Sequence, residues 1–191
     1  NMTRTKTPIC DVGRKAENFK LKSTDNKILA LDDIKGSKGT LIMFICNHCP
    51  YVIHIRDSFV KFASEYTSKG LAIVAICAND VETHPDDGPE KMAEEAATVG
   101  YLFPYLYDES QDVAKAYRAA CTPDFFLFDE QHRLVYRGRY DESLPENDNP
   151  VSGSDLSAAV EAVLAGESLG EEQHASVGCN IKWKSGNEPS Y

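Results

Sequence analysis

The fold is decided by the stretch Thr40-Leu41-Ile42-Met43-Phe44-Ile45-Cys46-Asn47-His48-Cys49-Pro50-Tyr51. Its first six residues form an almost entirely apolar run, which predicts a strand buried on both faces. After Pro50 the apolar residues recur at spacings of three and four, which predicts an amphipathic helix over about 48–68. Pro50 suits the first turn of that helix, where its missing N–H would have no intrahelical partner. Residues 46–51 are therefore expected at the joint between a buried strand and a long helix.

Two cysteines spaced as Cys-x-x-Cys at this joint indicate redox chemistry. Cys46 is expected to point at the unpaired N–H groups and the positive dipole end of the helix, which favour a thiolate. Thiol pKa values in such motifs fall to between about 3.5 and 7.5, and the thiolate is the nucleophile. Cys49 is close enough to form a disulfide with Cys46, and a protonated His48 would stabilise the anion further. A structural zinc site is disfavoured, because no second ligand pair completes it.

The composition is that of an ordinary globular domain. The chain has 191 residues, of which 42% are hydrophobic and 26% charged, and six cysteines are too few for a disulfide scaffold of this length. The formal net charge of -10 argues against nucleic acids and anionic membranes as partners. No apolar run is long enough to cross a bilayer. Residues 1–8 lack the apolar core of a signal peptide, so a cytoplasmic location is expected.

The remaining segments predict alternating strands and helices. Alternation predicts an N-terminal hairpin over 19–23 and 27–31, and a second apolar run predicts a buried strand over 71–77, parallel to the first. Further predictions are a helix over 89–99, a short edge strand over 103–108, a helix over 110–117, a hairpin of 125–128 with 134–138, and a helix over 154–165. We expect a domain over 1–165 and a tail over 166–191 that docks through Ile181 and Trp183.

This order of elements resembles the thioredoxin fold. The N-terminal hairpin and the strand and helix inserted between the two halves resemble the alkyl hydroperoxide reductase and thiol-specific antioxidant (AhpC/TSA) superfamily, which includes the peroxiredoxins. The resemblance covers about residues 9–165 and is carried by Phe44-Ile45-Cys46-Asn47-His48-Cys49-Pro50 and Cys121-Thr122-Pro123-Asp124-Phe125-Phe126. Residues 178–183 resemble the end of a peroxiredoxin-like subgroup. The implied fold class is α/β, a thioredoxin fold with a peroxiredoxin-type insertion.

The resemblance assigns a role to Thr122-Pro123. Thioredoxin-like proteins carry a cis-proline at this position, facing the Cys-x-x-Cys loop. A cis bond before Pro123 would leave the Thr122 backbone free to pair with an extended substrate peptide and would keep metals away from the thiols. A simple proline at the start of a strand is the alternative.

Two departures from the family patterns bear on function. Similar peroxiredoxins carry Pro-x-x-x-Thr-x-x-Cys, with the peroxidatic cysteine where Cys49 lies, but Ile42 and Cys46 replace the Pro and the Thr. Pro123 also stands where that family places an arginine. The peroxide pocket is therefore in doubt. His48 inside the motif resembles thiol oxidases, which implies a reduction potential higher than that of ordinary thioredoxin.

The other cysteines have more than one interpretation. Cys121 would lie near the Cys46 loop, as a third redox thiol or a packed thiol. Cys179 would resolve an oxidised Cys46 if the tail folded back, but packing of the tail is the preferred interpretation. Cys77 is expected to be a small core residue and Cys10 to be incidental.

The resemblance and the motif together imply a thiol-disulfide oxidoreductase, with Cys46 attacking and Cys49 resolving. Its substrates would be protein or small-molecule disulfides, and a thiol reductant would recycle it, with no cofactor. One alternative is a peroxiredoxin-like peroxidase acting on peroxides. Another is a Cu(I) carrier that uses Cys46, Cys49 and Cys121, although the short spacing and the cis-proline disfavour it.

Overall fold

The computed structural model describes residues 4–6, 12–170 and 173–191 of the chain. Within these residues, seven strands form a central sheet in the order β3-β2-β6-β5-β4-β8-β9. Its strands are β2 (Lys20–Ser23), β3 (Ile28–Ala30), β4 (Thr40–Phe44), β5 (Ala72–Cys77), β6 (Tyr105–Tyr107), β8 (Asp124–Phe128) and β9 (Leu134–Gly138). The helices are α1 (Leu31–Ile34), α2 (Pro50–Ser68), α3 (Pro89–Val99), α4 (Asp112–Ala116) and α5 (Ser154–Leu164), with a 3-10 turn η1 (Pro85–Asp87).

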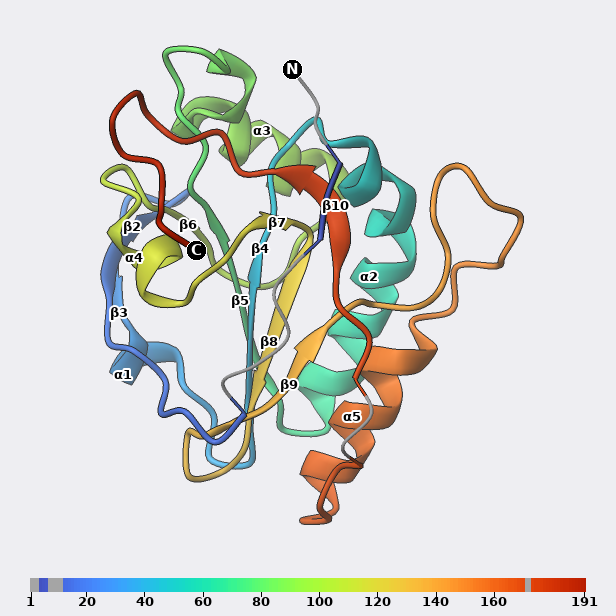
Figure 1. The fold of residues 1–191 in the computed structure, drawn as a ribbon. Helices are drawn as coiled ribbons and strands as arrows, with labels where there is room; N and C mark the ends of the chain where they lie inside the picture. Colours follow the sequence, from blue (N-terminus) through green and yellow to red (C-terminus); the bar gives the residue numbers. More distant parts are fainter. Residues whose placement is uncertain (1–3, 7–11, 171–172) are drawn as a thin grey trace.

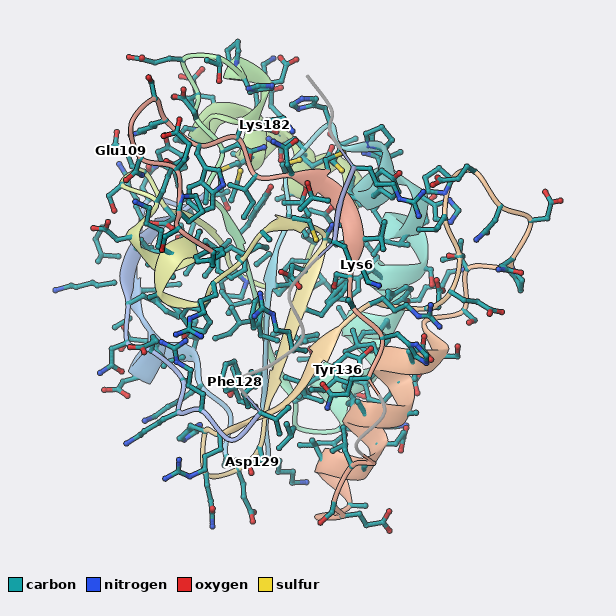
Figure 2. The ribbon with its side chains drawn as sticks, in the orientation of Figure 1. Lys6, Glu109, Phe128, Asp129, Tyr136 and Lys182 are labelled. Atoms are coloured by element: carbon teal, nitrogen blue, oxygen red, sulfur yellow. The ribbon has the colours of Figure 1, made fainter. Side chains whose placement is uncertain are left out.

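Helices cover both faces of the central sheet and make a three-layered α/β structure. Phe59 of α2, Met92 of α3 and Leu156 of α5 belong to one apolar cluster, and Figure 1 shows α2 and α5 side by side on that face. Leu31 of α1 and Val113 of α4 belong to a second cluster on the other face. Figure 2 shows side chains filling the space between these layers. The predicted α/β class is confirmed.

The central strands are parallel where the sequence predicted it. All five residues of β4 are buried, as its apolar run requires. Met43 lies opposite Ala75 of the parallel strand β5 and opposite Phe125 of the antiparallel strand β8. Helix α2 connects β4 to β5, which confirms the predicted parallel βαβ unit.

The predicted hairpins are present, but β6 is not an edge strand. Strands β2 and β3 pair antiparallel, and so do β8 and β9. Strand β6 lies between β5 and β2, because β2 pairs antiparallel with it through Lys22 opposite Tyr107 and Ser23 opposite Leu106. The N-terminal hairpin therefore extends the sheet beyond β6, and the prediction of an edge strand at 103–108 was wrong.

A second, smaller sheet carries the C-terminal tail. In the described part of the chain it contains β1 (Arg4–Lys6), β10 (Val177–Asn180) and β7 (Cys121–Thr122), in that order. Both neighbours of β10 run antiparallel to it. Ile181, which follows β10, is 1% exposed and belongs to the second apolar cluster, and Trp183 packs against that cluster. The tail thus crosses the end of the central sheet and lies over the start of α2 (Figure 1).

Among the described residues, no helix is both long enough and apolar enough to span a bilayer. The 19-residue helix α2 is amphipathic, with Arg56 and Glu65 outside its buried face. Its buried side is built on Phe59, whose ring lies 5.3 to 5.8 Å from the rings of Phe62, Phe103, Phe125 and Tyr140. This aromatic cluster anchors α2 against the sheet and so fixes the position of the loop before it.

Candidate active site

The Cys-x-x-Cys loop ends at the first turn of α2, where Cys49 is the N-cap residue. The N–H groups of Val52 and Ile53 donate to the carbonyl of Cys49 at 3.0 and 2.9 Å. Cys46 lies three residues earlier, between the end of β4 and the helix. The sequence predicted a helix from about residue 48, with Cys46 facing its N-terminus, but the helix begins at Pro50. Cys49 therefore lies closest to the positive end of the helix dipole.

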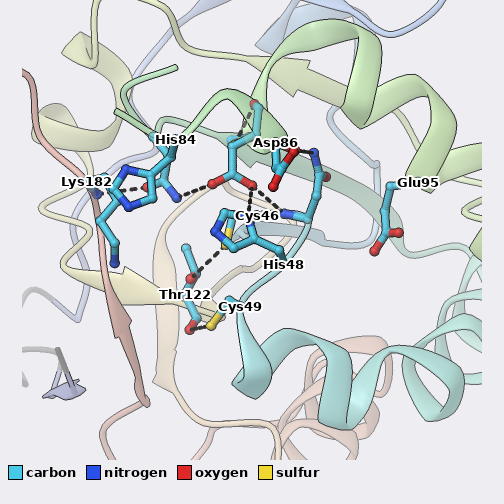
Figure 3. Close-up of polar contacts among 12 residues, drawn as sticks. Cys46, His48, Cys49, His84, Asp86, Glu95, Thr122 and Lys182 are labelled. Atoms are coloured by element: carbon cyan, nitrogen blue, oxygen red, sulfur yellow. Dashed lines mark hydrogen bonds and ion pairs between the residues drawn. The ribbon is translucent and has the colours of Figure 1, made fainter. Parts of the chain in front are cut away.

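Three cysteine sulfurs gather around Thr122. Cys49 Sγ lies 3.4 Å from the carbonyl oxygen of Thr122 and 2.7 Å from Cys179 Sγ. Cys46 Sγ lies 3.6 Å from Thr122 Oγ1. All three thiols are free and at most 2% exposed. Figure 3 shows Cys46, Cys49 and Thr122 converging where α2 begins.

The three thiols of the cluster shift one another's pKa values in opposite directions. The hydrogen bonds that Cys49 shares with Cys179 and with Cys46 hold the pKa of the Cys49 thiol far below its usual range, although burial opposes this. The bond to Cys49, burial and the nearby Asp87 carboxylate all raise the pKa of Cys46. The bond to Cys49 likewise raises the pKa of Cys179. These directions favour a thiolate on Cys49, whereas the sequence led us to expect it on Cys46.

His48 is held by a buried carboxylate and not by a thiol. Its Nδ1 lies 3.0 Å from Oδ1 of Asp87, which is fully buried. Asp87 also accepts hydrogen bonds from the backbone N–H of Asn47 and from the side-chain amide of Asn79, each at 2.9 Å. The opposite ring face of His48 is stacked near His84, with centroids 6.0 Å apart. Asp87 thus positions the Cys-x-x-Cys loop, a role that the sequence did not indicate.

The Thr122-Pro123 peptide bond is cis, as predicted. The Thr122 backbone, however, is not left open for a substrate peptide. Cys179 of β10 lies directly opposite Thr122 in an antiparallel pairing. The tail occupies this edge, and the prediction of a free Thr122 backbone was wrong because β10 was not anticipated.

Cys121 does not join the thiol cluster. It precedes Thr122 on β7, and side chains alternate along a strand, so the two face opposite ways. Its sulfur contacts the carbonyl of Pro123 at 3.8 Å. Among the described residues no group of three or more His, Cys, Asp or Glu side chains is placed to hold a metal ion, so the copper-binding trio is not assembled. Cys77 is fully buried in β5, as expected for a core residue, and Cys10 lies outside the described residues.

A hollow of about 70 Å³ lies beside the thiol cluster. Its lining includes Tyr51 and His54 of α2, Pro123, Ser143 and Val177 at the start of β10. The hollow is large enough for about two water molecules and too small for a peptide. None of the three cysteines lines this hollow, and because they are at most 2% exposed, a disulfide substrate reaches their sulfurs only when part of the covering structure moves.

The sequence model described as "AhpC/TSA family" matches residues 12–137. The thiol-disulfide oxidoreductase ResA of Halalkalibacterium halodurans is 26% identical over 123 residues, covering 64% of this chain and 65% of that protein. The match thus spans less than two thirds of that relative's length.

Solved structures are similar over nearly the whole chain. An uncharacterized conserved protein from Geobacillus kaustophilus is 47% identical and superimposes with a TM-score of 0.94, covering 96% of this chain and 98% of that one. The thioredoxin domain of a thiol-disulfide oxidoreductase from Bacteroides vulgatus is 16% identical, with a TM-score of 0.60, covering 80% and 99% of the two chains. At that identity the likeness shows the fold alone, which is the expected thioredoxin fold.

Proposed function

Because this chain belongs to the AhpC/TSA family, we propose that it is a thiol-disulfide oxidoreductase in which Cys46 and Cys49 cycle between dithiol and disulfide. One observation carries the proposal. Cys49, whose pKa is held far below the usual range, lies at the start of α2, hydrogen-bonded to Cys46 and in contact with Thr122 next to the cis-proline. A dithiol that reduces a disulfide needs one thiolate to attack the substrate and a neighbouring thiol to resolve the mixed disulfide.

The reaction needs two exchange steps. Cys49 Sγ attacks one sulfur of a substrate disulfide, which forms a mixed disulfide and releases the other sulfur as a thiolate that takes up a proton. Cys46 then loses its proton and attacks Cys49 Sγ, which forms the Cys46-Cys49 disulfide and releases the second substrate thiol. Two protein thiols are oxidised and one substrate disulfide is reduced. The order reverses the roles expected from the sequence, because the pKa of Cys49 is lowered and that of Cys46 is raised.

The substrates are protein or small-molecule disulfides, and a separate thiol reductant returns Cys46 and Cys49 to the dithiol. The net charge of -10 disfavours nucleic acids and anionic membranes as partners. A reducing compartment such as the cytoplasm would keep the buried Cys77 and Cys179 as thiols. Cell fractionation with alkylation of thiols tests the compartment, and recovery of the protein in an oxidising compartment would refute it.

Turnover of a protein disulfide with dithiothreitol as reductant tests the proposed activity. The Cys49→Ala variant should lose at least about a hundredfold in rate, because the nucleophile is gone. Cys121→Ala is the matched control, since it removes a buried thiol outside the cluster and should keep the rate. Equal rates in wild type and Cys49→Ala would rule out the proposal.

A second candidate is a peroxidase, and the position of Cys49 favours it. Cys49 occupies the peroxidatic position of the family and is the stabilised thiolate. Its sulfur would attack one peroxide oxygen and become a sulfenic acid as water leaves, and a second thiol would then form a disulfide and release another water. Ile42 and Cys46 in place of the family's Pro and Thr count against it. Faster oxidation of the reduced protein by hydrogen peroxide than by a disulfide would select this candidate.

A further inference from the structure

Strand β10 of the tail lies where an extended peptide would pair beside the cis-proline. Cys179 is opposite Thr122 and Asn180 is opposite Cys121 in this antiparallel pairing. Strand addition of this kind is a general way in which a sheet edge binds an extended peptide. The other edge of β10 is covered by β1, where Arg4 lies opposite Cys179. The chain's own tail therefore has the geometry of a bound substrate.

The fit between β10 and the cis-proline loop is close. A side chain at position 178 would collide with the carbonyl oxygen of Thr122, so Gly178 is required for this approach. The approach brings Cys179 Sγ to 2.7 Å from Cys49 Sγ, and both residues are almost completely buried. Cys179 thus lies where the sulfur of a substrate would have to lie to react with Cys49.

Hydrogen bonds after β10 fix the register of the tail. Ile181 donates its N–H to the carbonyl of Ala120 at 3.1 Å, and Lys182 donates its N–H to Oδ1 of Asn79 at 2.9 Å. Asn79 in turn donates to Asp87, which also holds the Cys-x-x-Cys loop. Figure 3 shows Lys182 and His84 beside this network. The tail and the active-site loop share one set of polar contacts, so Cys179 is held in place relative to Cys49.

We propose that Cys179 is a third redox thiol, which attacks Cys49 Sγ when Cys49 is in a disulfide, either with a substrate or with Cys46. The proposal rests on the proposed function, because it gives that site's disulfide a second resolving thiol. In the step itself, Cys179 Sγ attacks Cys49 Sγ of the Cys46-Cys49 disulfide. The Cys49-Cys179 bond forms, the Cys46-Cys49 bond breaks, and the departing electron pair and the proton from Cys179 go to the Cys46 sulfur. No outside oxidant or reductant is consumed, and Cys46 is returned as a thiol.

The test uses full-length Cys46→Ala, in which Cys49 has only Cys179 as a neighbouring redox thiol in the cluster. The reduced variant is treated with oxidised glutathione, trapped with N-ethylmaleimide at several times, and mapped by mass spectrometry over all its cysteines. We expect a transient glutathione adduct on Cys49 that converts to a Cys49-Cys179 disulfide. The proposal would be overturned if the variant is folded, the glutathione adduct on Cys49 is stable, and Cys179 is recovered as an alkylated free thiol.

Matched variants complete the design. In Cys46→Ala/Cys179→Ala the adduct on Cys49 should decay at least about tenfold more slowly than in Cys46→Ala, because both resolving thiols are gone. Cys46→Ala/Cys121→Ala is the control and should behave like Cys46→Ala. If a variant fails to fold, wild-type protein equilibrated with glutathione supplies the answer, since absence of any Cys49-Cys179 disulfide there also overturns the proposal. Failure of the proposed function can be distinguished from failure of this proposal. If the proposed function is wrong, the protein does not turn over a disulfide substrate, whether or not a Cys49-Cys179 bond is found.

Discussion

At the scale of single residues, the position of Cys49 decides which sulfur carries charge. Cys49 is the N-cap residue of α2 and shares hydrogen bonds with two neighbouring thiols, while the bond to Cys49, burial and the Asp87 carboxylate raise the pKa of Cys46. The low dielectric of the interior makes both effects strong. The redox site therefore contains one thiol with a lowered pKa, Cys49, between two thiols with raised pKa values.

Ultraviolet absorbance of thiolates tests this assignment without requiring access to the buried sulfurs. The reduced wild-type protein should show about one thiolate at about pH 7, where an unperturbed thiol with a pKa of about 8.5 is mostly protonated. Cys49→Ala should lose that absorbance, and Cys46→Ala should keep it. If only Cys46→Ala loses the absorbance, the thiolate is Cys46 and not Cys49.

Asp87 is expected to stabilise the loop that carries the thiols. Asp87→Asn replaces a buried acceptor of three hydrogen bonds by an amide, and we expect the free energy of unfolding to fall by about 1–3 kcal/mol. Urea unfolding of the reduced protein measures it. Asp86→Asn is the matched control, because the Asp86 side chain is exposed, and should change stability by less than about 0.5 kcal/mol. Equal stability of the two variants would contradict the role of Asp87.

The sequence predicted part of this site. Cys46, Cys49 and Pro123 were found because the motif spacing and the family pattern are local in the chain. Asp87 and Cys179 were not assigned these contacts, because they reach the loop from 39 and 130 residues away. Such contacts depend on how the elements pack, and no local pattern carries that information.

At the scale of elements, segments with a clear local pattern were predictable, and the short strands of the second sheet were not. Strand β4 was predicted from a continuous apolar run, and helix α2 from apolar residues that recur every three or four positions. Strands β1, β7 and β10 have two to four residues each, and they exist because they pair with one another. The misplaced edge at β6 has the same origin, since strand order is set by pairing between distant segments.

Gly178→Ala tests whether β10 seals the thiols. The new Cβ would meet the carbonyl of Thr122, so β10 should move away, at a cost of about 1–3 kcal/mol in stability. Cys179 in the folded protein should then react with iodoacetamide several-fold faster than in wild type, as measured by mass spectrometry. Gly170→Ala is the matched control, since a Cβ there meets no atom within 4 Å. An unchanged Cys179 reaction rate in folded Gly178→Ala would contradict the sealing role.

At the scale of the whole molecule, the two apolar faces bury tyrosines as well as aliphatic side chains. Burial raises the pKa of Tyr105, Tyr117 and Tyr136, and raises that of Tyr140 to about 12. These hydroxyls stay protonated in the folded protein at pH values where the unfolded chain ionises. These raised pKa values make the free energy of unfolding depend on pH in the alkaline range.

The sign of that dependence follows from linkage. A raised folded-state pKa contributes stability that is present below the unfolded value of about 10 and is lost as the pH rises toward the folded value. We therefore expect the midpoint of urea unfolding to fall steadily between about pH 10 and about pH 12. Tyrosinate absorbance at each pH should appear together with unfolding. Ionisation of all the tyrosines at about pH 10 in protein that remains folded would contradict the prediction.

Single-turnover oxidation of the fully reduced protein is the first experiment to make, because it shows whether Cys49 and a neighbouring thiol exchange disulfides. The rate with a protein disulfide is compared with the rate with hydrogen peroxide, and the bonds formed are mapped by mass spectrometry. We predict faster oxidation by the disulfide, with every early bond containing Cys49. Faster oxidation by peroxide, or early bonds that leave Cys49 as a free thiol, would contradict this prediction.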